Sequence, residues 1–252
     1  MRIVAIIPAR MAASRFPGKP LTTILGLPMI EHVRRRVALC PLIDDAVVAT
    51  CDDEIKNVVE ETGGTVVMTS DRHTRCTDRV AEAAASIDAE VVVNIQGDEP
   101  LVVPRMLEEV LSPILDDSSL PATNLVMRIV DREEFLDPNV PKVVTNLVGD
   151  LLYISREPIP SQKMTEDSDY LKLKQLGIIA FRSDFLQVFA GLEPSPLEQI
   201  EAVDMMRAVE HGYRVRMVET TGPMIGVDVP RDVERIEKIM ASDPLVEQYI
   251  NG

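Results

Sequence analysis

The sequence predicts an α/β fold in which a Rossmann-like, mixed but mainly parallel sheet is flanked by helices. In the first half of the chain, short β-branched runs alternate with segments of helical periodicity, the pattern of βαβ units. The strand runs are apolar without alternation, which is typical of strands covered on both faces. The chain has 252 residues, 46% of them hydrophobic, enough for a sizeable core.

The first half contains four predicted strands, at residues 3–7, 46–50, 65–68 and 90–95. We expect helices at residues 29–39, 53–61 and 80–86 between them. Asp52 stands where an N-cap of the second helix belongs, and Thr77 or Asp78 is suited to cap the third. Together these elements predict a parallel sheet.

The second half is less regular and predicts the mixed part of the sheet. Strands are expected at residues 122–130, 143–147, 151–155, 172–181 and 215–218, with a hairpin turn at 148–150. Ser195-Pro196-Leu197-Glu198 has an N-cap, a proline at N1 and a capping-box glutamate, which predicts one helix reaching about His211. A closing helix is expected from Pro230. We find no linker, so residues 1–252 are predicted to form one domain.

Charge and composition exclude several classes of partner. The chain has 26 Lys plus Arg against 41 Asp plus Glu, a formal charge of -15, which disfavours nucleic acid and anionic membranes. Its three cysteines form no C-x-x-C pair, and no apolar stretch reaches the length of a membrane span. These features indicate a cytoplasmic enzyme or binding protein.

The loop after the first strand concentrates positive charge in this acidic chain. Arg10, Arg15 and Lys19 lie within ten residues, at the carboxyl edge of the sheet where ligands of parallel sheets bind. Guanidinium groups, backbone donors and an ammonium suit a triphosphate. The loop matches neither the P-loop nor the dinucleotide-binding pattern. An ordinary charged surface loop is the alternative.

Two aspartates are candidate Mg²⁺ ligands. Asp98 directly follows the strand at residues 90–95, at the same edge as the cationic loop, where a carboxylate facing phosphates suits magnesium. Asp228 precedes a helix that begins at Pro230 and has a similar setting. The alternative for Asp98 is a carboxylate that serves only a turn or the next helix.

Six motifs together resemble the 3-deoxy-manno-octulosonate cytidylyltransferase family. They are PARMAASRFPGKPL, NIQGDEP, His73-x-x-x-Thr77-Asp78-Arg79, Tyr153-x-Ser155-Arg156-x-Pro158-Ile159-Pro160, Pro196-Leu197-Glu198-x-Ile200-Glu201 and Gly226-Val227-Asp228. The resemblance implies a nucleotide-diphosphosugar-transferase-like fold, a homodimer and dependence on Mg²⁺. It implies the reaction of CTP with an anionic sugar acid to give a CMP-sugar acid and pyrophosphate.

The resemblance also implies roles for individual residues. Arg10, Lys19 and Asp98 would be catalytic, and Asp98 and Asp228 would hold Mg²⁺. The residues implied to bind the nucleotide are Pro8, Ala9, Arg10, Arg15, Lys19, His73, Arg75, Thr77, Arg79, Gln96 and Asp98. The residues implied to bind the acceptor are Gln96, Arg156, Gln175, Ile179, Asp204 and Met205. A β-rich region at about residues 120–190 would serve acceptor binding and dimerisation. We favour a structural or base-pocket role for His73 over a catalytic base.

The chain departs from the family pattern in two places. Arg75 and Cys76 replace small residues beside the base, which bears on the preference for CTP. Gln175, Ile179 and Asp204-Met205 replace an imidazole, a phenol and a Glu-Gln pair in the acceptor pocket, so a different acid is possible.

Two interpretations of the acceptor site and two further functions therefore stay open beside transfer of CMP to a sugar acid. Ile179 and Met205 are core residues in one interpretation and part of a reshaped acceptor site in the other. A second possible function is nucleotidyl transfer to a phosphorylated or phosphonate compound, for which Arg156 and Arg207 offer positive charge. A third is a catalytically silent nucleotide-binding protein.

Overall fold

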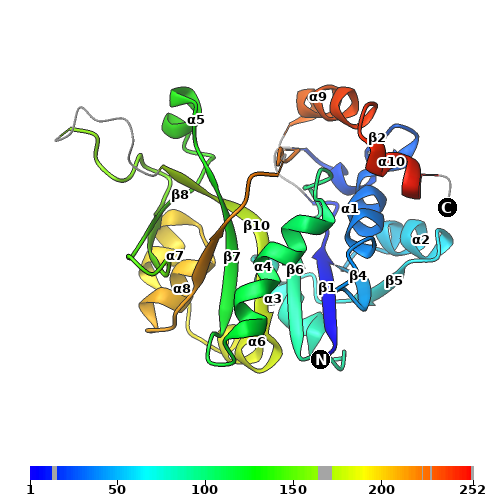
Figure 1. Cartoon of the computed structure of the whole chain (residues 1–252). Helices are drawn as coiled ribbons and strands as arrows, with labels where there is room; N and C mark the ends of the chain where they lie inside the picture. Colours follow the sequence, from blue (N-terminus) through cyan, green and yellow to red (C-terminus); the bar gives the residue numbers. More distant parts are fainter. Residues whose placement is uncertain (13–15, 164–171, 223, 228, 251–252) are drawn as a thin grey trace. The chain divides into compact units, whose positions relative to one another are not determined.

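The computed structural model describes residues 1–12, 16–163, 172–222, 224–227 and 229–250. The chain divides into two compact units (Figure 1). Unit 1 comprises Met1–Glu108 and Gly222–Gly252, and unit 2 comprises Glu109–Thr221. The boundary falls within one helix, α4 (Pro104–Asp116). In the described residues no helix has the length and apolar character needed to span a membrane.

Unit 1 is built on a parallel sheet that confirms the four strands predicted for the first half. The strands are β1 (Ile3–Pro8), β4 (Asp45–Thr50), β5 (Thr65–Met68) and β6 (Val91–Ile95). Their order is β6-β1-β4-β5, and every neighbouring pair is parallel. All residues of β1 are buried, as its unbroken apolar sequence predicts. The carboxyl ends of β1 and β6 therefore lie side by side.

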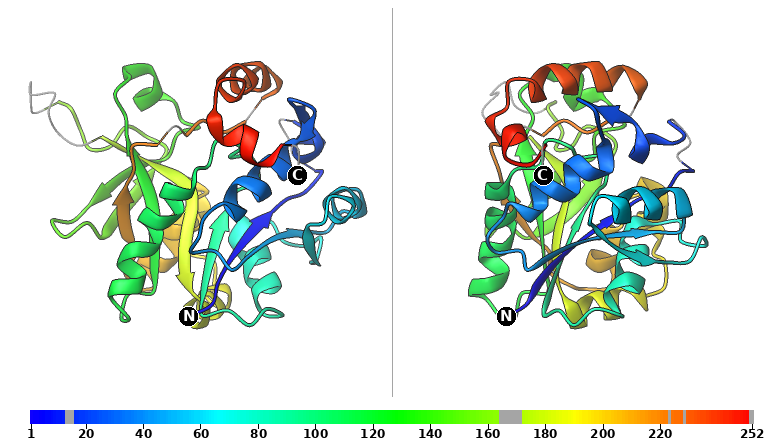
Figure 2. Two further views of the ribbon diagram at one scale, coloured as in Figure 1. Left: turned by 45° about the vertical axis from the view of Figure 1, so that its right-hand side comes forward. Right: turned by 90° about the vertical axis from the view of Figure 1, so that its right-hand side faces the viewer.

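Three helices connect these strands: α1 (Met29–Ala38), α2 (Asp53–Glu61) and α3 (Cys76–Ala84). Because crossovers between parallel strands are right-handed, α1 and α2 cover one face and α3, which returns the chain from β5 to β6, covers the other (Figure 2). The predicted start of α3 was wrong. Its N-cap is Arg75, so Thr77 and Asp78 lie inside the first turn, where Thr77 is buried.

Two short segments complete unit 1. A 3-10 helix, η1 (Lys19–Leu21), leads into a two-stranded hairpin of β2 (Thr23–Ile24) and β3 (Leu27–Pro28). At the other end of the chain, α9 (Pro230–Met240) begins at the predicted proline, and a further helix, α10 (Pro244–Tyr249), follows it. Side chains from the hairpin, α1, α9 and α10 share one hydrophobic cluster.

Unit 2 contains the mixed part of the structure. Its strands are β7 (Ala122–Arg128), β8 (Lys142–Thr145), β9 (Leu151–Ser155), β10 (Leu173–Arg182) and β11 (Arg216–Glu219). β11 is parallel to β7, whereas the pairs β7–β10, β10–β8 and β8–β9 are antiparallel. The helices are α5 (Arg132–Leu136), α6 (Ser183–Ala190), α7 (Pro196–Glu201) and α8 (Met205–Glu210).

The single helix predicted from Ser195 to about His211 is wrong, because the chain forms α7 and α8 there. Ala202 ends α7 in the left-handed region, with φ 54° and ψ 44°. The backbone N–H of Val203 then bonds back to the carbonyl of Glu198. This turn leaves the side chain of Glu201, the last residue of α7, at the end of β9, where it accepts two hydrogen bonds from the strand and one from Arg156 just after it.

Candidate active site

The cationic loop after β1 is closed at its base and anchored to a neighbouring loop. The backbone N–H of Gly18 donates to the carbonyl of Met11 at 3.0 Å, and Gly18 has φ +75°, which favours glycine. Asp52 Oδ2 accepts the backbone N–H of Met11 at 2.7 Å. Asp52 is the N-cap residue of α2, as predicted, but its side chain makes no bond to that helix. Its carboxylate holds the loop instead.

Gly97 brings the loop after β6 against the end of β1. A Cβ at this position would lie 3.0 Å from the carbonyl oxygen of Pro8 and 3.3 Å from the side chain of Ile30. Only glycine fits this approach without a shift of the surrounding atoms. The next residue is Asp98, so the close packing sets its carboxylate beside the loop that follows β1.

Lys19 and Asp98 form the centre of the site. The Lys19 ammonium donates to Asp98 Oδ2 at 2.5 Å and to the carbonyl of Val227 at 2.8 Å. The backbone N–H of Val227 in turn donates to the carbonyl of Asp98 at 3.0 Å. The two charged side chains are 14% and 27% exposed, so they are shielded yet open to a ligand. Three segments distant in sequence therefore converge on one ammonium group.

The donor chemistry at this place fits magnesium. No group of three or more His, Cys, Asp or Glu side chains with metal-binding geometry occurs among the described residues. Mg²⁺ is commonly held by one or two carboxylates together with substrate phosphates and water, so the carboxylate of Asp98 suits it. Asp228, the second predicted ligand, lies outside the described residues, as does Arg15 of the cationic loop.

The start of α3 gathers four of the predicted nucleotide-binding residues. Arg79 is buried, and its Nη1 donates to Thr69 Oγ1 at 2.5 Å. His73 Nε2 bonds to the carboxylate of Glu82, which also accepts the backbone N–H of Ser70 at 3.0 Å. The bond from Ser70 is the main cause that lowers the pKa of Glu82 below its usual value. His73 is therefore tied to a carboxylate, in agreement with a structural role. Arg75 is partly exposed and Thr77 is buried.

The remaining predicted nucleotide-binding residues lie at the strand ends. Pro8 ends β1 and Ala9 is buried just beyond it. Arg10 is exposed, and its guanidinium has no hydrogen-bond partner within the described part of the chain. Gln96 is partly buried directly after β6. Arg10, Gln96 and the Lys19–Asp98 pair thus follow β1 and β6, two neighbouring parallel strands of unit 1.

In unit 2 the predicted acceptor residue Arg156 is held on several sides. Its backbone N–H donates to Glu201 Oε2 at 2.8 Å, its Nε donates to the carbonyl of Glu201 at 2.8 Å, and its Nη1 donates to the carbonyl of Pro138 at 3.0 Å. The carboxylate of Glu201 also accepts the hydroxyls of Tyr153 and Ser155. Burial acts to raise the pKa of Glu201, but these bonds outweigh it and lower that pKa.

A buried lysine connects Arg156 to the next strand. Lys142 Nζ donates to the carbonyls of Asp137 at 2.9 Å and Arg156 at 2.5 Å, and burial lowers the pKa of this lysine. Gln175 of β10 lies close to Lys142, because its backbone N–H donates to the carbonyl of Pro141, the residue before this lysine. Lys142 was not among the predicted site residues, since nothing in the sequence shows that it is buried.

The other predicted acceptor residues differ in exposure. Gln175 Nε2 donates to Asn124 Oδ1 at 2.7 Å, beside an irregularity in β10 between Gln175 and Ile179. Ile179 is 5% exposed and Met205 is fully buried, which supports the core-packing alternative for both. Asp204, the N-cap residue of α8, is partly exposed.

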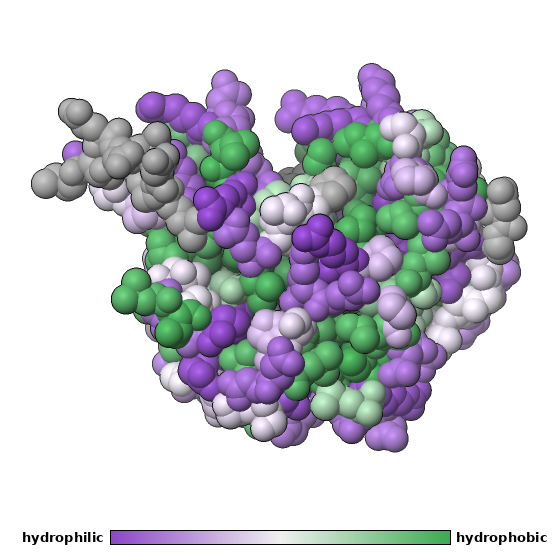
Figure 3. Space-filling model, in the orientation of Figure 1, coloured by the Kyte–Doolittle hydropathy of each residue, from purple (hydrophilic) through white to green (hydrophobic). Residues whose placement is uncertain are grey.

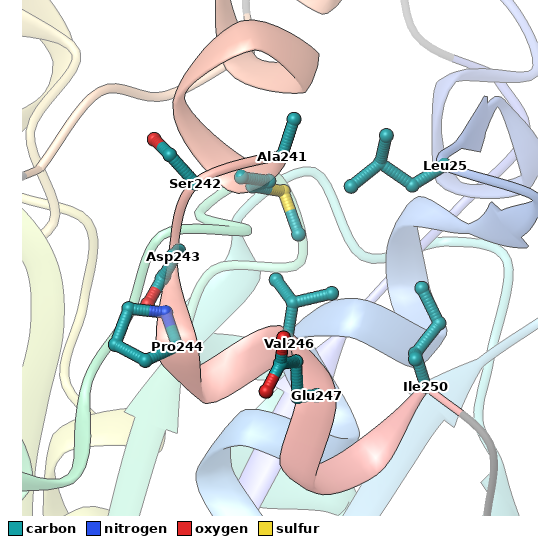
Figure 4. A pocket seen from close by; sticks show the side chains of 9 residues that line it. Leu25, Ala241, Ser242, Asp243, Pro244, Val246, Glu247 and Ile250 are labelled. Atoms are coloured by element: carbon teal, nitrogen blue, oxygen red, sulfur yellow. The ribbon is translucent and has the colours of Figure 1, made fainter.

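A separate groove in unit 1 lies away from these residues (Figure 4). It has a volume of about 520 Å³ and runs between Leu25 of the β2–β3 turn and the C-terminal residues 240–250. None of the predicted site residues lines it. The groove is therefore not the centre defined by Lys19 and Asp98.

Proteins of known family match this chain over nearly its whole length. A family model described as cytidylyltransferase matches residues 4–219. The chain belongs to the cytidylyltransferase family. A 3-deoxy-manno-octulosonate cytidylyltransferase from Geobacter metallireducens is 45% identical over 245 residues, covering 94% of this chain and 96% of that one. Its counterpart from Syntrophotalea carbinolica is 46% identical over 244 residues, covering 94% and 98%.

A solved structure agrees with these relatives. A CMP:2-keto-3-deoxy-manno-octonic acid synthetase in complex with CTP superposes with a TM-score of 0.89 at 38% identity, covering 96% of this chain and 99% of that one. The resemblance found in the motifs and the predicted fold class are both confirmed. The enzyme is a CTP-dependent nucleotidyltransferase.

Proposed function

We propose that this cytidylyltransferase transfers CMP from CTP to the anomeric hydroxyl of 3-deoxy-manno-octulosonate or a closely related sugar acid and releases pyrophosphate. The observation that carries the proposal is the convergence of Lys19, Asp98 and Val227 at the carboxyl edge of the parallel sheet. The relatives named for this activity extend over nearly the whole chain, which supports the same acceptor class.

In the proposed reaction, the chain's cations bind and orient the triphosphate. Arg10, exposed at the end of β1, and Lys19 would contact phosphate oxygens and offset the charge that develops during transfer. Asp98, with Asp228, would hold Mg²⁺, which supplies a Lewis acid to the phosphate oxygens when bound. The acceptor hydroxyl attacks the α-phosphorus in line and loses its proton to solvent. The bond between the α-phosphorus and the oxygen that bridges it to the β-phosphorus breaks, and that oxygen leaves with pyrophosphate.

Arg156 is the proposed partner of the acceptor's carboxylate. Two of its guanidinium nitrogens are fixed by the carbonyls of Glu201 and Pro138, so its orientation is set before the acceptor binds. A pre-oriented guanidinium loses little side-chain freedom when it pairs with a carboxylate. Gln175 and Asp204 are proposed to contact the acceptor's hydroxyl groups. The nearby carboxylate of Glu201 disfavours a phosphate dianion at the same place.

We further propose that two copies of the chain associate through unit 2. Leu147 and Val148 at the turn between β8 and β9, Leu152 of β9 and Ile200 of α7 are large, exposed hydrophobic side chains. Figure 3 shows hydrophobic atoms projecting at the left edge, over the β8–β9 hairpin. Burial of this group against a second copy would stabilise a homodimer. Because CTP is a cytoplasmic nucleotide, the proposed reaction also favours a cytoplasmic enzyme.

The proposal is tested by measuring pyrophosphate release with Mg²⁺ and each of the four common nucleoside triphosphates. The acceptors are 3-deoxy-manno-octulosonate, a sialic acid, smaller 2-keto acids, a sugar phosphate and a phosphonate. We expect release with CTP and 3-deoxy-manno-octulosonate or one of the related acids. Release only with the phosphorylated or phosphonate compounds would show a different acceptor class. CTP binding without release for any acceptor would overturn the proposed transfer.

A further inference from the structure

The position of the Lys19 ammonium depends on residues from the far end of the chain. Lysine is a flexible side chain with a point charge, so its place is set by the groups that its ammonium contacts. One of the two acceptors bound to Lys19 is the carbonyl of Val227, in the segment that leads into α9. The C-terminal part of the chain therefore supplies one of the two hydrogen-bond acceptors that hold this ammonium.

The same C-terminal part also holds the backbone just after Lys19. The backbone N–H of Leu25 donates to Glu237 Oε1 of α9 at 3.2 Å. The carbonyl of Ile24 bonds to His32 Nε2 at 2.7 Å, and His32 Nδ1 bonds to the hydroxyl of Tyr249 in α10 at 2.9 Å. α9 directly and α10 through His32 thus hold the β2–β3 hairpin, which begins four residues after Lys19.

A buried ion pair fixes the two helices themselves. Arg36 of α1 is fully buried, and its guanidinium bonds to Asp243, between α9 and α10, and to the carbonyl of Val102. Its charge also lies over the ring of Tyr249, 5.8 Å from the ring centroid. Removing one partner of a buried ion pair strongly lowers the free energy of unfolding, so this contact holds the C-terminal segment against α1.

One hydrophobic cluster unites the three segments that meet at Lys19. It contains Ile24 from the hairpin, Leu101 from the segment after Asp98, and Val227. The rest of the cluster consists of Met29 of α1 and of Ile236, Met240, Val246 and Tyr249 of α9 and α10. A shift of α9 or α10 would therefore also move the segments that contain Lys19, Asp98 and Val227.

We propose that α9 and α10, here called the C-terminal clasp (residues 230–249), hold Lys19 in its triphosphate-binding position, with Asp243 and Tyr249 as positioning residues. Neither residue touches the nucleotide in this account. They act by fixing the hairpin and the Val227 carbonyl, so that the ammonium is pre-organised rather than ordered by the ligand. Pre-organised donors contribute more to binding and transition-state stabilisation because less freedom is lost.

The test is a double-mutant cycle on CTP affinity, measured by titration calorimetry with Mg²⁺ and without acceptor. The variants Asp243→Asn and Tyr249→Phe are made both in the native chain and together with Lys19→Met. Asparagine can still cap α10, and phenylalanine keeps the ring over Arg36. We expect each variant to weaken CTP binding by about 5- to 20-fold in the native chain and by less than about twofold when Lys19 is already absent.

The control is Val59→Ala in α2, a fully buried residue outside the cluster. It should lower the melting temperature and leave CTP affinity within about twofold of the native value. Equal weakening by the clasp variants with and without Lys19 would show a general structural role and overturn the proposal. So would native CTP affinity in folded Tyr249→Phe and Asp243→Asn. Since no acceptor is present, a failure of the proposed acceptor chemistry would not affect this result.

Discussion

At the scale of single residues, Asp52 is the carboxylate that anchors the cationic loop. Its Oδ2 accepts the backbone N–H of Met11, one residue after Arg10. Asp52→Ala removes this acceptor, so the loop must be ordered by CTP itself. We expect the KM for CTP to rise about 5- to 20-fold with a smaller change in kcat, which corresponds to a loss of about 1–2 kcal/mol.

Steady-state kinetics of pyrophosphate release provide the measurement for Asp52. Asp52→Asn is the matched control, because a carboxamide oxygen can still accept the Met11 N–H. It should retain a KM for CTP close to the native value. A rise of equal size in both variants would mean that the charge, and not the hydrogen bond, is what the loop requires.

Gly97 is a second single residue on which the site depends. Gly97→Ala places a Cβ 3.0 Å from the carbonyl oxygen of Pro8, so the loops after β1 and β6 must move apart. We expect a loss of about 1–3 kcal/mol in the free energy of unfolding, measured with urea, together with a clear fall in kcat/KM for CTP.

Gly191→Ala, after α6, is the corresponding control for Gly97. Its Cβ would meet only ordinary contacts, the nearest at 3.5 Å from the carbonyl oxygen of Val188. This variant should keep both activity and stability near native values. If Gly97→Ala behaved in the same way, the close approach of the two loops would not define the site.

At the scale of elements, the corner between α7 and α8 carries backbone strain. Ala202 adopts φ 54°, a region that costs an L-residue about 1–2 kcal/mol relative to glycine. Ala202→Gly should therefore raise the free energy of unfolding by up to about 1 kcal/mol once the greater freedom of the unfolded chain is subtracted. Urea denaturation is the measurement. Ala208→Gly, within α8, should lower stability, and a decrease for both would contradict the strain.

The same corner shows what the sequence could and could not predict. The strand at residues 65–68 and the helix at residues 53–61 were predicted to the residue, because β-branched runs and helical periodicity are local signals. The break at Ala202 depends on the bonds that Glu201 makes to β9, more than 40 residues away in sequence. α10 is six residues long and is held by His32 and Arg36, so its own sequence gives little indication of it.

The candidate site follows the same rule. Lys19 and Asp98 were predicted to share one edge of the sheet because the carboxyl ends of parallel strands lie at the same edge, and they form an ion pair. Val227 positions both residues through two long-range hydrogen bonds, and Asp52 holds the loop before Lys19 through one, from the N–H of Met11. None of these bonds has a local sequence signal beyond the cap position of Asp52.

At the scale of the whole molecule, the net charge of -15 contrasts with a polyanionic substrate. Arg10, Arg15 and Lys19 concentrate positive charge in one loop, while the acidic surplus is spread over the rest of the chain. We therefore expect binding of CTP to depend on the local field of this loop and on the proposed Mg²⁺, and not on the overall charge.

Global stability should depend on pH through His32. Burial, aided by the charges of Arg36 and Arg35, lowers the pKa of His32 below its value of about 6.5 in an unfolded chain. The unfolded state therefore takes up the proton first. The stabilisation is complete above about pH 6.5 and is lost as the pH falls from there towards the lowered pKa of the folded state.

Urea denaturation of the native chain and His32→Gln between pH 7.5 and 5 measures this contribution. The native chain should lose stability more steeply on acidification, by at most about 1.4 kcal/mol per pH unit from this one group. His73 and His211 are common to both proteins, so the difference isolates His32. Parallel pH profiles would contradict the assignment.

At the catalytic centre, Lys19, Asp98 and Val227 are proposed to bind the triphosphate of CTP for transfer of CMP to a sugar acid. Mass spectrometry of a reaction with CTP, Mg²⁺ and 3-deoxy-manno-octulosonate tests it most directly, with Lys19→Met and Asp98→Asn run in parallel. We expect a CMP-linked sugar acid from the native enzyme and a loss of at least about 100-fold in its rate of formation in both variants. Undiminished product formation in either folded variant, or no CMP adduct from the native enzyme with any sugar acid, would contradict it.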